Sequence, residues 1–155
     1  MRSTYTVQTH VHPDRLMDTI LDFGNYPSFA PYLHSCTVVL EKDNMWEVNF
    51  VVQVIHTLNY RLRLIRTENE INWTLVEGAF TENSGYWKVE PIIGEDGAIQ
   101  GSNLTYCLQV EINTFIPSSV RNTLYREMLP KTVHAFIDET IHRELLKNTA
   151  VHAQE

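Results

Sequence analysis

The chain has 155 residues, of which 43% are hydrophobic and 20% charged, and its formal net charge is −7. This length suits one domain of the usual ~100–200 residues, and the composition excludes collagen-like, coiled-coil and largely disordered proteins. The negative charge repels nucleic acids and anionic membranes, so we expect no nucleic-acid partner and at most transient membrane contact.

The sequence contains no signal of export, membrane insertion or cofactor binding. No apolar run resembles a signal peptide or a membrane span. The two cysteines, Cys36 and Cys107, have neither metal-ligand nor redox spacing, and no nucleotide-binding or nucleophile motif is found. We therefore expect a cytoplasmic protein, a monomer or dimer, with no cofactor and no metal.

The first third of the chain predicts one strand and two short helices. Residues 5–11 alternate in polarity and are rich in β-branched side chains, which is typical of a strand. Pro13 and Asp14 suit the start of a helix that ends near Gly24. The two prolines of residues 26–32 exclude a long helix there but allow a short helical turn.

The middle of the chain predicts six strands joined by short connections, and therefore antiparallel hairpins. In the central strands every second residue is almost always apolar, and all three tryptophans belong to this set. One face of the sheet is therefore buried and the other is exposed to solvent. A solid core and a lined cavity fit this alternation equally well. The predicted strands span residues 34–41, 45–56, 58–67, 70–78, 84–91 and 102–113.

The last part of the chain predicts one long amphipathic helix from Pro117 to about Lys147, bent at Pro130. A curled sheet covered by a single helix tends to leave room for a small molecule between them. The face that we expect to pack on the sheet carries Tyr125, Leu129, Val133, Phe136, Ile137 and Ile141.

Several short motifs resemble those of a known superfamily. They are Val11-His12-Pro13, the segment Tyr26-Pro27-Ser28-Phe29-Ala30-Pro31, the pair Glu77-Gly78-Ala79-Phe80 and Tyr86-Trp87-Lys88-Val89-Glu90-Pro91, and a terminal strand that enters the helix at Pro117. With these motifs the chain resembles the START-like, or helix-grip, superfamily over about residues 3–147. It is most similar to the branch of coenzyme Q-binding START-domain proteins and bacterial polyketide cyclase/dehydrase proteins. The family often has Gly-Pro-Phe where this chain has Gly78-Ala79-Phe80.

The resemblance implies an α+β helix-grip fold: a curved seven-stranded antiparallel sheet wrapped around a long C-terminal helix, with two short helices after the first strand. We expect one START-like ligand-binding domain over residues 1–148 and a flexible tail over residues 149–155. Members of the family hold quinones, lipids or polyketides between sheet and helix, which favours the lined cavity over the solid core. The residues expected to line it are Tyr26, Phe29, Tyr32, Phe50, Val52, Tyr60, Leu62, Arg66, Trp73, Leu75, Phe80, Trp87, Tyr106, Leu108, Leu129, Val133 and Phe136.

Three functions stay open. The first is non-catalytic binding or transport of a hydrophobic small molecule such as a quinone, lipid or polyketide. The second is a polyketide cyclase or dehydratase, with Arg66 as a weak catalytic candidate because related cyclases carry an arginine at a similar place; the alternative is that Arg66 pairs with Glu68 or Glu70 at a wet strand end. The third is an interaction with the ribosome, as in a toxin of a related branch.

Overall fold

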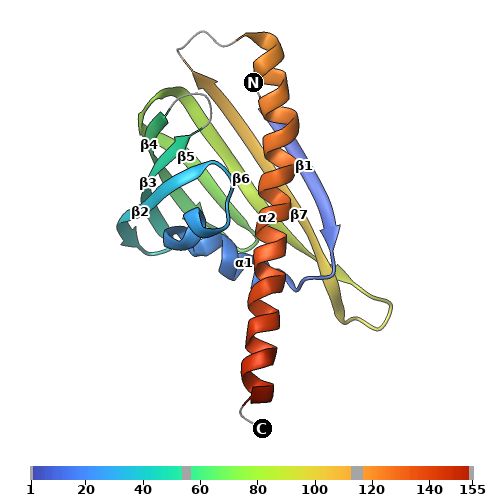
Figure 1. Ribbon diagram of the computed structural model, residues 1–155. Helices are drawn as coiled ribbons and strands as arrows, with labels where there is room; N and C mark the ends of the chain where they lie inside the picture. The colour runs from blue at the N-terminus through green and yellow to red at the C-terminus, as the bar shows by residue number, and fades with distance from the viewer. Residues whose placement is uncertain (1, 54–56, 113–116, 154–155) are drawn as a thin grey trace.

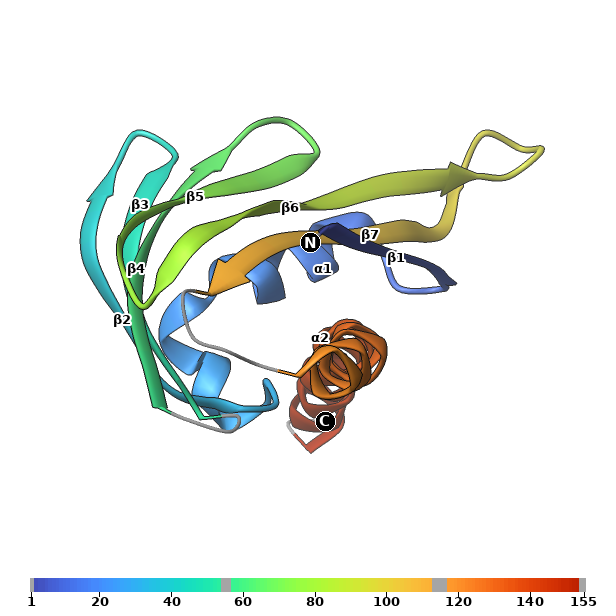
Figure 2. The same cartoon turned by 90° about the horizontal axis from the view of Figure 1, so that it is seen from above.

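The computed structural model describes residues 2–53, 57–112 and 117–153. A seven-stranded antiparallel sheet in the order β1-β7-β6-β5-β4-β3-β2 curls around one long helix, as the sequence predicts (Figures 1 and 2). The elements in chain order are β1 (Arg2–Thr9), α1 (Pro13–Leu21), the 3-10 helix η1 (Phe23–Ser28), β2 (Leu33–Lys42), β3 (Met45–Gln53), β4 (Thr57–Arg66), β5 (Glu70–Gly78), β6 (Phe80–Ile93), β7 (Ile99–Ile112) and α2 (Ser118–Ala153).

The sheet bends most strongly on the side of β2 to β5, while α1, η1 and α2 all lie on its concave side (Figure 2). Register shifts between Val38 and Leu40 and between Arg61 and Leu62 mark irregularities in two of the strand pairs. Such bulges increase the local twist and bend a strand. The curvature therefore comes from the strands themselves, and the helices fill the concave side.

Helix α1 begins where the sequence predicts. Pro13 occupies the first turn, and the His12 side chain caps the helix by accepting a hydrogen bond from the Asp14 amide at 3.1 Å. Leu16 and Ile20 lie one turn apart and are fully buried. This face closes one end of the concave side of the sheet.

The start of β6 differs from the prediction. The strand begins at Phe80, not at residue 84, and the turn from β5 is confined to Gly78 and Ala79. Gly78 has φ of 130°, and a Cβ there would come within 2.4 Å of the Tyr60 Cα, so only glycine fits. The polar run of residues 81–83 belongs to the strand and contains a register shift, which is why it looked like a loop in the sequence.

Helix α2 packs through the predicted face only in part. Leu129, Val133, Phe136 and Ile137 are buried as expected, but Ile141 is 40% exposed, whereas the adjacent Thr140 is buried against Thr19 of α1. The C-terminal part of the helix projects past the sheet (Figure 1). The side chain of Tyr125 lies outside the described residues. The helix runs on to Ala153, so residues 149–153 of the expected tail are helical. No described helix is long and apolar enough to cross a membrane.

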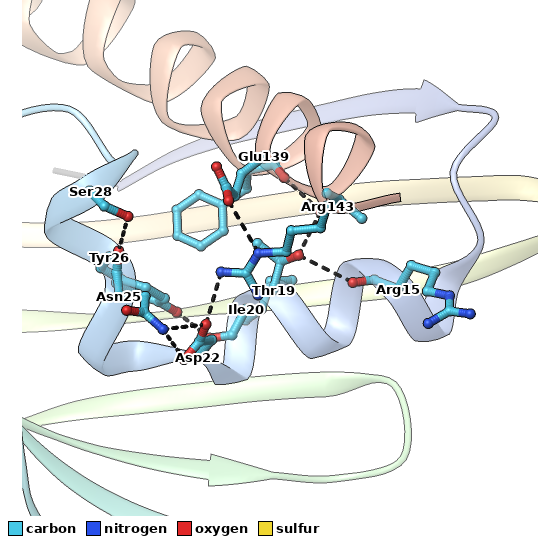
Figure 3. A network of polar contacts seen from close by, with 11 residues as sticks. Arg15, Thr19, Ile20, Asp22, Asn25, Tyr26, Ser28, Glu139 and Arg143 are labelled. Carbon is cyan, nitrogen blue, oxygen red and sulfur yellow. Dashed lines mark hydrogen bonds and ion pairs between the residues drawn. The ribbon is translucent and has the colours of Figure 1, made fainter. Parts of the chain in front are cut away.

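Polar contacts fix α2 to the α1–η1 corner (Figure 3). The buried hydroxyls of Thr140 and Thr19 are 2.8 Å apart, and Arg143 contacts Asp22 at 2.8 Å and Glu139 at 3.2 Å. Hydrogen-bonded charges that lie partly out of water contribute more than an exposed pair. The segment from Phe136 to Arg143 is therefore the part of α2 whose position is best defined.

Gly85 in β6 allows an indole to lie flat on the sheet. A Cβ at this position would come within 2.0 Å of the Cys107 carbonyl oxygen and 2.6 Å of Trp73 Cζ2. Neither the backbone of β7 nor a buried tryptophan ring can move away cheaply. The ring of Trp73 thus requires a residue without a side chain on the neighbouring strand.

We expect Gly85→Ala to lower the free energy of unfolding by about 1–3 kcal/mol or more, since it overpacks a core position. Gly24→Ala is the matched control: nothing lies within 4 Å of a Cβ there, so the change should stay within about 0.5 kcal/mol. Urea denaturation of both variants measures the difference. Equal stabilities of the two would show that the Trp73 ring is not held against Gly85.

Candidate functional site

The concave face of the sheet is tightly buried beside α1 and more accessible toward its other end. Leu64, Ile71 and Leu104 near α1 are at most 4% exposed. Farther along the same face five inward-pointing side chains are only half-buried, although all are large and aromatic or aliphatic, while their neighbours Phe50 and Leu62 are buried. We call this region the open end; it consists of Tyr60, Leu75, Phe80, Tyr106 and Leu108.

An aromatic cluster around Phe136 joins α2 to η1 and to the sheet. The Phe136 ring on α2 lies 4.9 Å from Tyr26 and 5.0 Å from Phe29, both in edge-to-face geometry, and 4.8 Å from Trp87 on β6. Such pairs add about 0.5–1.5 kcal/mol each beyond their burial. The Tyr26 hydroxyl donates to the Ile20 carbonyl, so it holds η1 on α1 and is not available to a ligand.

A second aromatic group lies at the open end itself. Phe50 on β3 and Tyr60 on β4 stack with their rings 5.3 Å apart and 14° between planes. Phe80 meets Tyr60 edge-on at 4.8 Å. Because Tyr60 and Phe80 are half-buried, this group presents flat aromatic surface on the concave side of the sheet.

The side chains of Tyr60 and Tyr106 at the open end are surrounded by protein atoms but stay partly accessible to solvent. Burial raises the pKa of Tyr60 and of Tyr106 well above the usual range of tyrosine. At neutral pH these hydroxyls are therefore protonated and can donate a hydrogen bond.

Sequence reasoning missed one buried polar group next to this region. Asn83 on β6 is 4% exposed, and its Oδ1 accepts a hydrogen bond from Trp73 Nε1 at 3.1 Å. The amide satisfies the indole and fixes the orientation of its ring. An asparagine in a polar run next to a turn gave no sign in the sequence that it would point inward.

The structure brings most of the expected lining residues to the concave face but not Arg66. Arg66, the last residue of β4, pairs with Ile71 of β5 and is exposed. This agrees with the solvent-exposed strand end weighed from the sequence and not with a buried, inward-pointing arginine. Ligand contact by the others stays a prediction. The buried ones are Tyr26, Phe50, Val52, Leu62, Trp73, Trp87, Leu129, Val133 and Phe136, and the half-buried ones are Phe29, Tyr32, Tyr60, Leu75, Phe80, Tyr106 and Leu108.

A histidine of α2 contacts the first strand of the sheet. His134, which shares a helix face with Asp138 and His142, places Nε2 3.0 Å from the Tyr5 hydroxyl on β1. The two rings also meet edge-to-face at 5.9 Å. Among the described residues no three potential metal ligands lie close together. His134 therefore serves as a contact between α2 and β1.

Comparisons with known proteins agree with this architecture. Residues 9–137 match the family described as polyketide cyclase / dehydrase and lipid transport. No curated protein matches the chain at a significant level. The match covers well over half of the chain, which is enough to show the family, while the coenzyme Q-binding branch stays a prediction.

Three solved structures are similar in fold. A START superfamily protein from Mycobacterium smegmatis has a TM-score of 0.77 at 18% identity, over 91% of this chain and 97% of that one. An aromatase/cyclase from Streptomyces sp. R1128 has a TM-score of 0.75 at 16% identity, over 92% and 94%. A STAR-related lipid transfer protein from Xanthomonas axonopodis has a TM-score of 0.76 at 12% identity, over 90% and 85%. The chain therefore belongs to the polyketide cyclase/dehydrase and lipid transport family and has the START-like helix-grip fold.

Proposed function

We propose that this protein binds a neutral hydrophobic small molecule, such as a quinone, lipid or polyketide-like compound, on the concave face between the sheet and α2. The observation that carries the proposal is the open end, where large apolar side chains face inward and yet stay partly accessible. A packed core would bury them. A ligand seated there would complete their burial.

The charge of the concave face supports a neutral ligand. Among the described positions of β3 to β7 that share the inward parity, the only charged side chain is Arg66, and it is exposed at the end of β4. A charged ligand would lose its hydration without gaining a counter-charge, which is strongly unfavourable. The Tyr60 and Tyr106 hydroxyls suit a carbonyl or ether oxygen on an otherwise apolar molecule.

The apolar surface is sufficient for useful affinity. Burying ~400 Å² of ligand surface at ~25 cal/mol per Å² gives about 10 kcal/mol. Association costs of at least ~4 kcal/mol oppose this gain, which leaves a dissociation constant in the micromolar range.

Menadione, a small neutral quinone, is a suitable probe. We expect it to bind with a micromolar dissociation constant in calorimetry and to raise the melting temperature in a saturable way. Leu108→Trp should fill the open end and weaken binding about tenfold or more, with Leu75→Phe as a second space-filling variant. Ile65→Trp is the matched control, because Ile65 is exposed on the outer face of β4.

Two results together would contradict the binding proposal. The first is that neither menadione nor a fatty-acid methyl ester changes the melting temperature. The second is that protein purified from cells carries no hydrophobic compound in native mass spectrometry. Equal weakening by Ile65→Trp and Leu108→Trp would instead place the binding site elsewhere.

A second candidate function is that of a cyclase or dehydratase at the same face. With Arg66 in solvent, the groups left to orient a substrate oxygen are the phenols of Tyr60 and Tyr106. Because their pKa values are raised by burial, they stay protonated, so they can donate a proton or a hydrogen bond but cannot act as a base at neutral pH.

We expect Tyr60→Phe to weaken menadione binding about fivefold through loss of one hydrogen bond, and Arg66→Ala to leave it unchanged. The β-hydroxyketone formed from benzaldehyde and acetone distinguishes binding from catalysis, because its loss of water produces an absorbing enone. Non-catalytic binding predicts no acceleration of that loss. Acceleration that disappears in Tyr60→Phe would favour the dehydratase.

A further inference from the structure

The outer face of the sheet contains a hollow that is separate from the proposed ligand face. It has a volume of about 600 Å³ and lies across β2, β3, β4 and β5. Phe50, Val51, Tyr60 and Gly78 form part of its lining. The polar residues that line it are Ser35, Thr37, Asn49, Asn59, Arg61 and Glu77. Along β3 and β4 the polar lining residues alternate with Phe50 and Tyr60, whose rings form part of the concave face.

Strand register explains why these side chains meet. Thr37 is paired with Asn49, Asn49 with Arg61, and Arg61 with Glu77, so the four form one row across four strands. Their neighbours Phe50 and Tyr60 point to the concave face, where their rings stack. Side chains alternate between the faces of a sheet, so the row and the rings are separated by the sheet itself.

Arg61 is held in this row without being neutralised at close range. Its Nε donates to Asn49 Oδ1 at 2.7 Å, which fixes the plane of the guanidinium. Its Nη2 lies 3.8 Å from Glu77 Oε1, beyond hydrogen-bond distance, and the Glu77 side chain is 68% exposed. The edge formed by the two terminal nitrogens therefore stays available for a second partner.

Arg63, on the same face of the same strand, shows the contrast. Its Nε and Nη2 both contact Glu47 Oε1, at 3.3 and 2.8 Å, so its donors are already engaged by a carboxylate. The partner of Arg61 is the side-chain amide of Asn49, whereas the partner of Arg63 is the carboxylate of Glu47. A guanidinium whose plane is fixed and whose two terminal nitrogens can be reached binds a carboxylate through two parallel hydrogen bonds.

We propose that this hollow binds a small organic carboxylate. The carboxylate is held by the terminal nitrogens of Arg61 and takes the place of the loosely paired Glu77. The hydroxyls of Ser35 and Thr37 and the amide of Asn59 line the remainder and suit polar groups on the same molecule. The site does not depend on the proposed hydrophobic ligand, because it lies on the opposite face.

Proton–nitrogen NMR spectra of the labelled protein, titrated with acetate, succinate and benzoate, test this proposal. At least one carboxylate should give saturable shifts in the amide signals of Asn49, Asn59, Arg61 and Gly78, and the matching uncharged amides should give none. Arg61→Gln should weaken binding about tenfold or more. Arg61→Lys should also weaken binding, because an ammonium group cannot form the two parallel hydrogen bonds of a guanidinium.

Two further variants complete the test. Arg63→Gln, the matched control, should leave the affinity unchanged within about twofold, since Arg63 is already bound to Glu47. Glu77→Gln should strengthen binding about two- to fivefold by removing a competing carboxylate. Absence of saturable shifts with all three carboxylates would overturn the proposal. So would binding that survives Arg61→Gln, or binding that weakens in Glu77→Gln.

Discussion

The packing of Phe136 against three other aromatic rings is the contact on which the arrangement of this protein depends. Phe136 lies on α2, Tyr26 and Phe29 on or beside η1, and Trp87 on β6, so one ring joins the long helix, the short helices and the sheet. The Thr140–Thr19 and Arg143–Asp22 contacts follow within two turns of the same helix. A single helix that covers a curved sheet needs such a defined point of attachment, because sliding along the sheet would otherwise cost little.

The alternation of side chains along β3 and β4 creates two unlike environments from one pair of strands. Phe50 and Tyr60 face the helix and offer aromatic surface without charge, whereas Asn49 and Arg61 face outward and offer oriented polar groups. A shift of either strand by one residue would exchange the two sets. The same register therefore supports both the hydrophobic face and the polar hollow.

The strand pattern, the apolar face of α2 and the family motifs were enough to predict the fold, because each repeats over many residues. The wrong predictions concern single residues whose surroundings no repeating pattern reveals. Arg66 has inward parity but is exposed as the last residue of β4, and Ile141 continues the apolar stripe of α2 but is exposed, while the adjacent Thr140 is buried against α1. The polar hollow could not be predicted either, because the register shift beside Arg61 decides which residues meet, and no local sequence pattern reveals such a shift.

The fixed indole of Trp73 also has an optical consequence. Trp73 and Trp87 both lie beside Tyr106, with ring centroids 5.6 and 4.4 Å away, while Trp46 packs against Phe23. Two of the three tryptophans thus share one neighbouring phenol on the concave face. Replacing Trp46 alone would leave an emission spectrum that reports on that face without any added dye.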